Sequence, residues 1–443
     1  MQTDPATDAR AAGKRTRLAW YAYDLGNTSV EFAVPLFLTV WIVTDLGVDA
    51  WVFGLATAIS SWAIGLSGPF IGVHADETHT RRRWFISSAS LAAILFASLS
   101  FFPRSGTAAL VTILVVAMAA NYFFQLSSLI YNASMLSAAC GANVVSVSSL
   151  GMGLSFVGGL AGIGIIEFVV EGHVIPGVSG RGYAIVPAAL LFVACTIPSV
   201  FTANLWQKKT DAVALPPGNL SQRMRTLWRE SSREYRAGWF LAGYFMLNSS
   251  IMGLTLYLPL HVEEVTGLRG MDLLMVFATV VITSAIGAGA VALMRPTGAM
   301  VKRIILTGSI LLSVNAILFS LVSSLPLVAA CSCLHGLFSG ALVPTVRGAF
   351  AQTFHSDYQA LAFGLFGAVQ RVSQGLGAAL WPLASTLGAD SATGAGIAAM
   401  AVLALIGVPL FSRWRPADSM IACADGVDTA QAAAGEQTGS PAP

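Results

Sequence analysis

The first long apolar span of the chain is Arg17–Gly47, RLAWYAYDLGNTSVEFAVPLFLTVWIVTDLG. It is apolar over most of its length but carries two acids in its first half, Asp24 and Glu31. Seven residues separate the acids, which is close to two helical turns, so a helix places both on one side. An acid that faces hydrocarbon at the middle of a membrane costs about 2.5 kcal/mol or more. We therefore expect this side to face other helices or a wet cavity, although Asp24 also fits a role at the membrane boundary.

The composition is that of a membrane protein. The 443 residues are 55% hydrophobic and only 10% charged, and the mean hydropathy is +0.72. Soluble domains contain about 25% charged residues, so this chain is predicted to lie in a bilayer. The net charge of +2 says little, because the placement of Lys and Arg matters more than their sum.

Twelve apolar spans, each about twenty residues or longer, follow one another along the chain. The longest polar segment between spans, 207–236, divides them six and six, as in transporters whose halves rock around a central site. We predict an all-α polytopic membrane protein with twelve transmembrane helices in two six-helix bundles. The spans lie near 18–44, 51–73, 84–102, 107–131, 146–170, 183–206, 237–262, 271–294, 301–323, 326–350, 359–386 and 391–412. The predicted parts are an N-terminal tail (1–17), a first bundle (18–206), a linker (207–236), a second bundle (237–412) and a disordered tail (413–443).

The basic residues predict the orientation in the membrane. Of the 24 Lys and Arg residues, nineteen fall in the segments that share a side with the N-terminus, three in the loops of the other side and two within spans. This asymmetry predicts that both termini and both tails are cytosolic, in the cytoplasmic (inner) membrane of a bacterium. The linker stretch RMRTLWRESSREYR is basic and is expected to lie along the cytosolic membrane surface.

One loop between spans resembles a family signature. The segment Gly68–Asp76, GPFIGVHAD, is followed by Arg81–Arg83. This pattern resembles the signature loop of the major facilitator superfamily: a glycine, an aspartate four residues on, and then basic residues. In that family the carboxylate and arginines can bridge helix ends in one conformation and release them in the other. The resemblance implies a conformational switch that also involves Arg347 of a later span; its candidate residues are Gly72, Asp76, Arg81, Arg82 and Arg347.

The loop also departs from the family pattern. Glu77 stands where a basic residue is usual, and His79 and Thr80 replace the usual glycine and arginine. The tight turn of the signature loop therefore lacks its glycine here. These departures support an alternative interpretation. In it, the protein is a transporter-like sensor or assembly scaffold that has lost transport.

Further motifs resemble the Atg22-like branch of that superfamily, also called the unknown major facilitator group. Trp20, Tyr23-Asp24 and Asn27 resemble its W-x-x-Y-D-x-A-N-S opening, and Gly340–Phe350, GALVPTVRGAF, resembles part of its second half. Tyr131-Asn132-Ala133, followed by several glycines, resembles its fifth span. The resemblance implies efflux of amino acids, as in a yeast vacuolar relative.

Two charges are expected to meet near the bilayer midplane. Arg371 lies twelve residues past the start of its span, and Glu31 reaches about the same depth from the first span. A buried arginine needs a partner. Pairing Glu31 with Arg371 would create either a gate between the two halves or a split site for a zwitterion; separate structural ties for each residue are the alternative.

Other polar residues within the spans are candidates for solute contact or proton coupling. Arg347 is expected to extend to the cytosolic boundary or to bind Asp357 or Asp76. His335 is either a packing residue or a titrating group. Spans 1, 4, 7 and 10 usually line the cavity in the resembled superfamily. The candidate substrate-binding or coupling residues are Asp24, Asn27, Glu31, Asn121, Gln125, Asn248, Tyr257, His335, Gln370 and Arg371.

The function predicted from these features is secondary active transport. We expect a small polar or zwitterionic solute, similar to an amino acid, to leave by proton-coupled efflux with alternating access; export of another metabolite or drug class is an alternative. An enzyme is not expected, because the six histidines are scattered without metal-ligand spacing. ATP-driven transport is not expected either, because the sequence has no Walker-type loop. We predict no cofactor and no metal. The expected partners are the solute, protons and the lipid bilayer, without nucleic acid, and the protein is expected to be a monomer.

Overall fold

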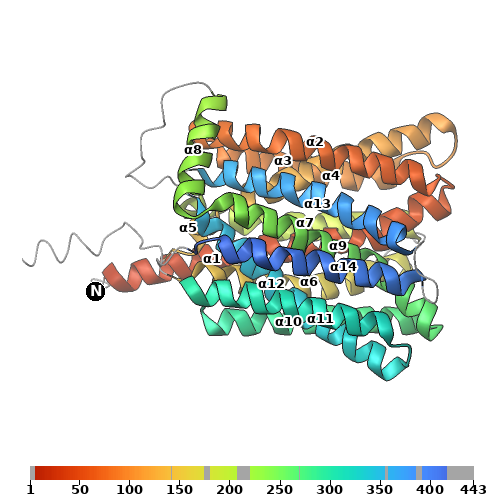
Figure 1. Ribbon diagram of the computed structural model, residues 1–443. Coiled ribbons are helices and arrows are strands. Elements are labelled where there is room, and N and C mark those ends of the chain that lie inside the picture. Colours follow the sequence, from red (N-terminus) through yellow and green to blue (C-terminus); the bar gives the residue numbers. More distant parts are fainter. Residues whose placement is uncertain are drawn as a thin grey trace, which may run out of the picture.

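The computed structural model describes residues 5–140, 142–173, 180–206, 220–268, 270–354, 358–385 and 392–416. Long helices lie side by side through most of this part of the chain (Figure 1). The first half contains α1 (Pro5–Ala33), α2 (Ala50–Glu77), α3 (Arg81–Ser98), α4 (Thr107–Ala133), the short α5 (Met135–Ala138), α6 (Val144–Val170) and α7 (Ile185–Phe201). The linker contains α8 (Leu220–Glu234), and the second half contains α9 (Ala237–Thr266), α10 (Gly270–Met294), α11 (Gly298–Leu321), α12 (Leu325–Thr353), α13 (Gln359–Ser385) and α14 (Ala392–Arg413).

Eleven helical segments within the described residues are long and apolar enough to cross a membrane. The twelfth spanning helix is α13, whose 27 residues give it the same length as α4 and α6. Its centre carries Gln370, Arg371, Ser373 and Gln374, which lower its apolar character. The predicted all-α fold with two six-helix halves is confirmed, and the most polar spanning helix is the one that carries a predicted central charge.

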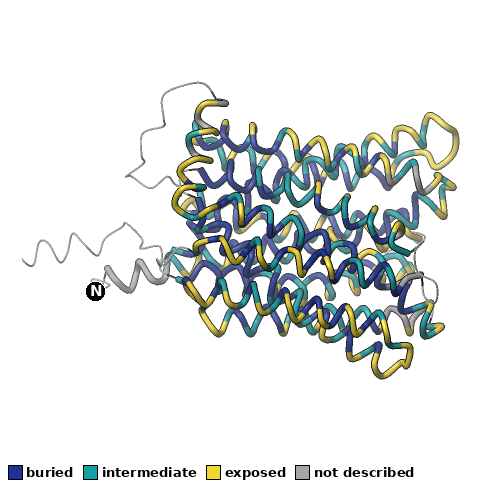
Figure 2. Tube along the Cα trace, in the orientation of Figure 1, coloured by how far each residue is buried: buried dark blue, intermediate teal, exposed yellow. Residues whose placement is uncertain are grey.

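Burial follows the pattern expected of a bundle in lipid. Figure 2 shows buried residues along the inner sides of the helices and exposed residues toward the outside. Many of the exposed side chains are large and apolar, such as Leu66, Leu293 and Leu321, each more than 70% exposed. An apolar exterior is stable only when lipid covers it. The outside of the bundle is therefore its lipid-facing surface.

The two halves meet through pairs of helices that occupy equivalent places in each half. The second helix of the first half, α2, packs on α13, and the equivalent α10 packs on α6. In the same way α4 contacts α13, and its equivalent α12 contacts α6. The interface thus has approximate two-fold symmetry, as expected for halves that share one helix order.

One end of the bundle, here called the basic face, carries most of the described cationic side chains. It is the end at which α2 and α10 finish and α3 and α11 begin. The helix α8 runs across this end, roughly perpendicular to the spanning helices (Figure 1). The first helix begins at Pro5, so much of segment 1–17 is helix continuous with the first span. The basic face includes Arg81, Arg82, Arg83, Arg229, Arg233, Arg295, Lys302, Arg303 and Arg413.

The first span changes its winding beyond Glu31. It continues as wider π-helical turns at Val34–Leu38 and Trp41–Asp45. Pro35 lies in the first of these turns, and Thr39 Oγ1 donates to the Val34 carbonyl at 3.0 Å. Such turns are often found at functional positions. The half of the first span distant from the basic face is therefore a place where the helix can bend.

The tight turn of the loop between α2 and α3 forms without glycine. His79 adopts a left-handed conformation, with φ of 56°, and Thr80 N donates to the Ala75 carbonyl at 3.1 Å. Histidine, like asparagine and aspartate, enters this region more readily than most residues. The departure from the family pattern therefore leaves the turn in place: His79 performs the conformational role of the missing glycine.

This conformation predicts a specific order of stabilities. Because a β-branched residue is strained at positive φ, His79→Val should lower the free energy of unfolding by about 1–2 kcal/mol. His79→Gly should leave it unchanged or raise it slightly. Thermal unfolding of the purified variants in detergent measures this order, and a His79→Val variant as stable as His79→Gly would contradict the assigned turn.

Candidate functional site

A buried ion pair joins the two halves near the basic face. Arg347 of α12 donates from Nη2 to Asp24 Oδ2 of α1 at 3.1 Å, and its Nη1 lies 3.4 Å from Oδ1. The side chains are only 8% and 6% exposed, respectively. Arg347 was expected to reach the cytosolic boundary or to bind Asp76 or Asp357. That interpretation is corrected here, because Arg347 instead points inward to Asp24; Asp357 lies outside the described residues.

Arg347 donates two further hydrogen bonds to the first half. Its Nε donates to Ser148 Oγ and its Nη2 to the Ser148 carbonyl, both at 3.0 Å. Ser148 Oγ in turn donates to the Pro344 carbonyl of α12 at 2.8 Å. The guanidinium also lies over the Trp20 ring, with 5.3 Å to its centroid. One arginine of the second half is therefore bound by α1 and α6 of the first.

Gly151 of α6 leaves the space for this arrangement. A Cβ at that position would lie 2.7 Å from the Trp20 ring and 3.1 Å from Asp24 Oδ2. Any larger residue would push the ring or the carboxylate away from Arg347. The glycine is thus required by the close approach of α1 and α6.

The signature loop forms a second connection between the halves. Asp76 Oδ1 accepts from Arg81 Nε at 2.5 Å, and Oδ2 accepts from the backbone N–H of Leu361 at 3.1 Å. Leu361 lies in the first turn of α13, where helix N–H groups lack partners and favour negative charge. A Cβ at Gly72 would overlap the Ala360 carbonyl, so only glycine allows this approach. The predicted switch residues Gly72, Asp76 and Arg81 thus lie at a junction of the two halves, whereas Arg82 Nε donates to Val200 O within the first half.

The equivalent loop of the second half, between α10 and α11, also contacts a helix start of the other half, but here the loop supplies the acceptor oxygens without a charged side chain. Asn143 caps α6, because its Oδ1 accepts from Ser146 N at 2.8 Å. Its Nδ2 donates to the carbonyls of Pro296 at 2.8 Å and Arg295 at 3.4 Å, in the loop between α10 and α11. In the first loop, the Asp76 carboxylate accepts a hydrogen bond from a backbone N–H at the start of α13. In the second loop, the carbonyls of Arg295 and Pro296 accept hydrogen bonds from Asn143, the side chain that caps the start of α6. Both connections close the basic face.

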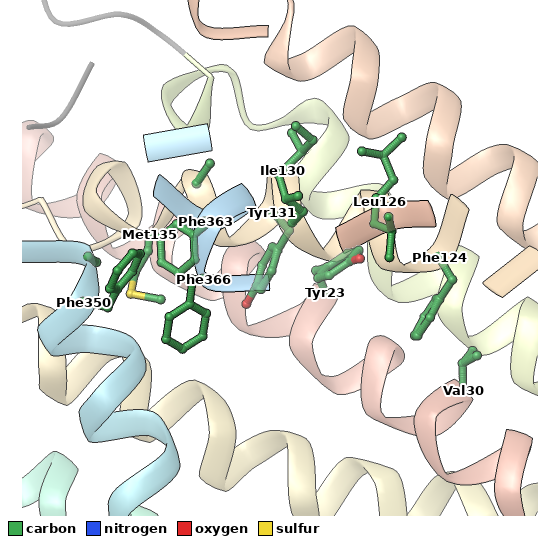
Figure 3. Close-up of a cluster of buried hydrophobic side chains, with 14 of the residues drawn as sticks. Tyr23, Val30, Phe124, Leu126, Ile130, Tyr131, Met135, Phe350, Phe363 and Phe366 are labelled. Atoms are coloured by element: carbon green, nitrogen blue, oxygen red, sulfur yellow. The ribbon is translucent and has the colours of Figure 1, made fainter. Parts of the chain in front are cut away.

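Aromatic side chains fill the space between these polar contacts. Tyr23 and Tyr131 lie against each other with ring centroids 4.2 Å apart, and Phe350 and Phe366 pack at 4.8 Å. Figure 3 shows these rings as neighbouring parts of one buried cluster. The cluster contains residues of both halves, so the halves are held together at this end by apolar packing as well as by polar contacts.

A further contact between the halves lies deeper in the bundle, at Arg371. This residue is about 18 Å along α13 from Gln359. Its Nη2 donates to Gln125 Oε1 of α4, and its Nη1 donates to Gln374 Oε1 at 3.1 Å. Gln125 belongs to the first half and Gln374 to the same helix as Arg371. The central arginine is therefore bound by two neutral amide oxygens.

Glu31 does not form the direct ion pair with Arg371 that we expected. Its Oε1 accepts from Asn27 Nδ2 at 3.0 Å, and the described residues contain no salt bridge to it. The side chain is exposed, yet Arg371 and Arg347 of the second half both act on it electrostatically. Glu31 thus lies on the side of α1 that faces the second half, near Arg371 but not bonded to it.

Most of the other predicted polar residues form hydrogen bonds with groups of their own half. Asn121 donates to Ser60 Oγ at 2.9 Å, Asn248 donates to Ser373 Oγ at 2.7 Å, and the Tyr257 hydroxyl donates to the Ala378 carbonyl at 2.8 Å. His335 is buried in α12, 3% exposed. Gln370 is half-buried, and its carbonyl accepts from Ser373 Oγ at 2.8 Å. These residues shape the centre of the bundle, but the structure does not gather them around Arg371.

Sequence reasoning missed Ser148 and Asn143. Ser148 is one of several small residues in the apolar, glycine-rich segment that forms α6, and no spacing in the sequence links it to Arg347. Asn143 carried a usable signal, since asparagine directly before an apolar span is a favoured helix cap. Its second role, toward Pro296, depends on a contact between distant parts of the chain.

The fold and these contacts define a polytopic membrane protein whose two six-helix halves close on each other at one face. A family model for the Major Facilitator Superfamily matches residues 25–303, more than half of the sequence. The chain belongs to the Major Facilitator Superfamily. The match does not separate branches, so the Atg22-like assignment stays a prediction.

Solved structures agree with this family. The chain is similar to the human organic anion transporter MFSD10 (TETRAN), with a TM-score of 0.64 and 17% identity over 90% of this chain and 99% of that one. It is also similar to the proton:xylose symporter XylE bound to 6-bromo-6-deoxy-D-glucose, with a TM-score of 0.66 and 11% identity over 93% and 96%. At these identities the likeness concerns the fold alone. No curated protein matches the sequence.

The two loop connections predict matched effects of two single substitutions. Asp76→Asn removes the charge at the start of α13, and Asn143→Ala removes the donor to Pro296, so both should increase labelling of buried interface positions from the basic face. A cysteine at Val145, which lies against Gly348 of the other half, measures this with a thiol reagent in membranes. Both variants should label several times faster than the parent.

A matched control is Asn132→Ala, because within the described residues Asn132 donates to Ser128 O of its own helix and to no group of the other half. It should label at the parental rate. Equal rates in all three variants would contradict the closure.

Proposed function

We propose that the protein is a secondary active transporter that moves a small polar or zwitterionic solute, similar to an amino acid, by alternating access. The observation that carries the proposal is the state of Arg371: a central guanidinium bound by two amide oxygens, with the exposed carboxylate of Glu31 nearby. A guanidinium suits a carboxylate, and a carboxylate suits an ammonium group. An amino acid presents both groups.

The direction of the closed face follows from the basic residues. We place the basic face and both termini in the cytosol, and the protein in a bacterial inner membrane, because Lys and Arg concentrate on the cytosolic side of membrane proteins. The described contacts between the halves then close the cytosolic side. In this arrangement Arg371 and Glu31 belong to an outward-facing state, ready to release or receive solute outside.

Glu31 is the proposed proton carrier. It lies at depth on the side of α1 toward the second half and has no direct cationic partner within the described residues. When the solute's ammonium group leaves, protonation of Glu31 would replace the lost positive charge. Efflux of solute would then be coupled to inward movement of a proton.

Two kinds of support bear on the solute class. The motifs that resemble the Atg22-like branch suggest amino-acid efflux. The structural neighbours are an organic anion transporter and a proton:xylose symporter, so their named solutes include one class with a negative charge and one sugar. A carboxylate fits the guanidinium of Arg371 better than a sugar hydroxyl does, because it can accept two parallel hydrogen bonds from that planar group.

Transport by reconstituted vesicles tests the site. Radiolabelled amino acids, simple carboxylates and sugars are compared with and without a pH gradient. Arg371→Lys should weaken uptake of carboxylate solutes by about tenfold or more, because lysine keeps the charge but loses the planar fork. Transport of sugars with no response to carboxylates would overturn the proposed solute class.

Glu31→Gln tests the coupling separately. This variant should lose dependence on the pH gradient and keep solute exchange at equal pH on both sides. Gln is close in size to Glu and still accepts from Asn27, so folding should be retained. If Glu31→Gln keeps the parental pH dependence, the proton is carried elsewhere, and Asp24 and His335 are the next positions to examine.

Fusions with paired reporters test the orientation. A reporter placed at Ser179 should report the outer side, and one placed at Asn219 the cytosol. Alkaline phosphatase, active outside, and a fluorescent protein, active inside, give opposite readings at the two sites. The reverse result would place the basic face outside and remove the outward-facing assignment.

A further inference from the structure

Among the hydrogen bonds between the halves within the described residues, the bond from Arg371 to Gln125 lies furthest from the basic face, and Arg371 also belongs to the proposed solute site. Its Nη2 donates to Gln125 across the interface, and its Nη1 donates to Gln374 along its own helix. Gly65 of α2 packs beside its stem, since a Cβ there would lie 3.8 Å from Arg371 Cβ. Arg371 therefore lies where α2 and α4 of the first half meet α13.

The acceptor on Nη2 is chemically replaceable. A guanidinium has five N–H donors and no acceptor. A carboxylate can accept two parallel N–H···O bonds from a guanidinium and brings a negative charge, whereas the amide of Gln125 offers one neutral oxygen. A solute carboxylate that reaches Arg371 therefore outcompetes Gln125 for the same donor, whereas a hydroxyl does not.

We propose that Gln125 is a built-in substitute for the solute carboxylate, and that the solute displaces it. In the empty protein the amide oxygen of Gln125 binds Arg371 and ties α4 to α13. When the solute carboxylate takes its place, this tie between the halves is lost. Solute binding thereby weakens the closed basic face and favours the opposite state. This inference rests on the proposed function and adds a specificity-determining residue to it.

Gln374 provides the contrast within the same site. It also accepts from Arg371, but both residues are on α13 and move together. Loss of the bond to Gln374 changes the surroundings of Arg371 without releasing one half from the other. Substitution of either glutamine changes the bonds of Arg371, but only substitution of Gln125 removes a bond between the halves. Comparing the two variants therefore distinguishes the two effects.

Distances between spin labels on the two halves measure this coupling. Ser87 of α3 and Ser412 of α14 are exposed residues near the basic face and accept labels in a cysteine-replaced protein. The probes are an equimolar mixture of the twenty proteinogenic amino acids, acetate, and xylose as the neutral control. In the parent protein, amino acids or acetate should increase the population with the longer distance, and xylose should not.

The variants give the decisive comparison. Gln125→Ala should show the longer distance without any probe, with the ratio of the two populations changed by about tenfold, the size expected for one hydrogen bond to a charged group. Added amino acids should change it little further. Gln374→Ala should behave like the parent without probe. Gln125→Glu should bind Arg371 as a permanent carboxylate, keep the short distance and lose the response to the probes.

The possible failures are distinct. If carboxylate probes shift the parent but Gln125→Ala matches Gln374→Ala, the displacement is wrong and the proposed function stands. If no carboxylate probe shifts the parent, or xylose shifts it equally, both the displacement and the proposed solute class are overturned. Circular dichroism of each variant confirms that the helices remain folded.

Discussion

The structure depends on one buried arginine that belongs to one half and is bound by the other. A guanidinium placed between membrane helices is costly unless it is paired and its donors are satisfied. Arg347 meets both conditions only while the halves are closed, because Asp24, Ser148 and Trp20 all belong to the first half. When the halves part at this face, water must replace these partners. The pair therefore favours two states, dry and closed or open and hydrated, over intermediates between them.

The other contacts between the halves change in character with their distance from the basic face. At the basic face, Asp76 and Asn143 each join a loop to a helix start of the other half, in places related by the approximate two-fold symmetry. Below them the aromatic cluster around Phe350 excludes water. Deeper still, Arg371 is bound by neutral groups that a solute can replace. The strongest ties lie away from the solute site and the most replaceable tie lies within it.

Much of this arrangement could be predicted from the sequence, but the helices could be predicted better than the contacts between them. Apolar length and basic asymmetry define the helices and their order, because both are local properties of the chain. The acids of the first span were expected to face inward, and Asp24 does so in contact with Arg347. The partners were predicted less well: Glu31 was paired with Arg371, and Arg347 with the boundary. Spacing places a residue at a depth, but which groups meet across an interface depends on helix rotation and on small residues such as Gly151, which local patterns do not specify.

The most direct test of the account is a double-mutant cycle on Asp24 and Arg347, read as the distance between labels on the two halves at the basic face. Asp24→Asn leaves a buried arginine without its acid, a loss of about 3–5 kcal/mol in comparable buried pairs. It should shift the protein strongly to the open distance. Arg347→Gln in the same chain should partly restore the closed distance, because no unpaired charge remains. If Asp24→Asn keeps the closed distance, or the two substitutions act additively, the buried pair does not hold the halves together.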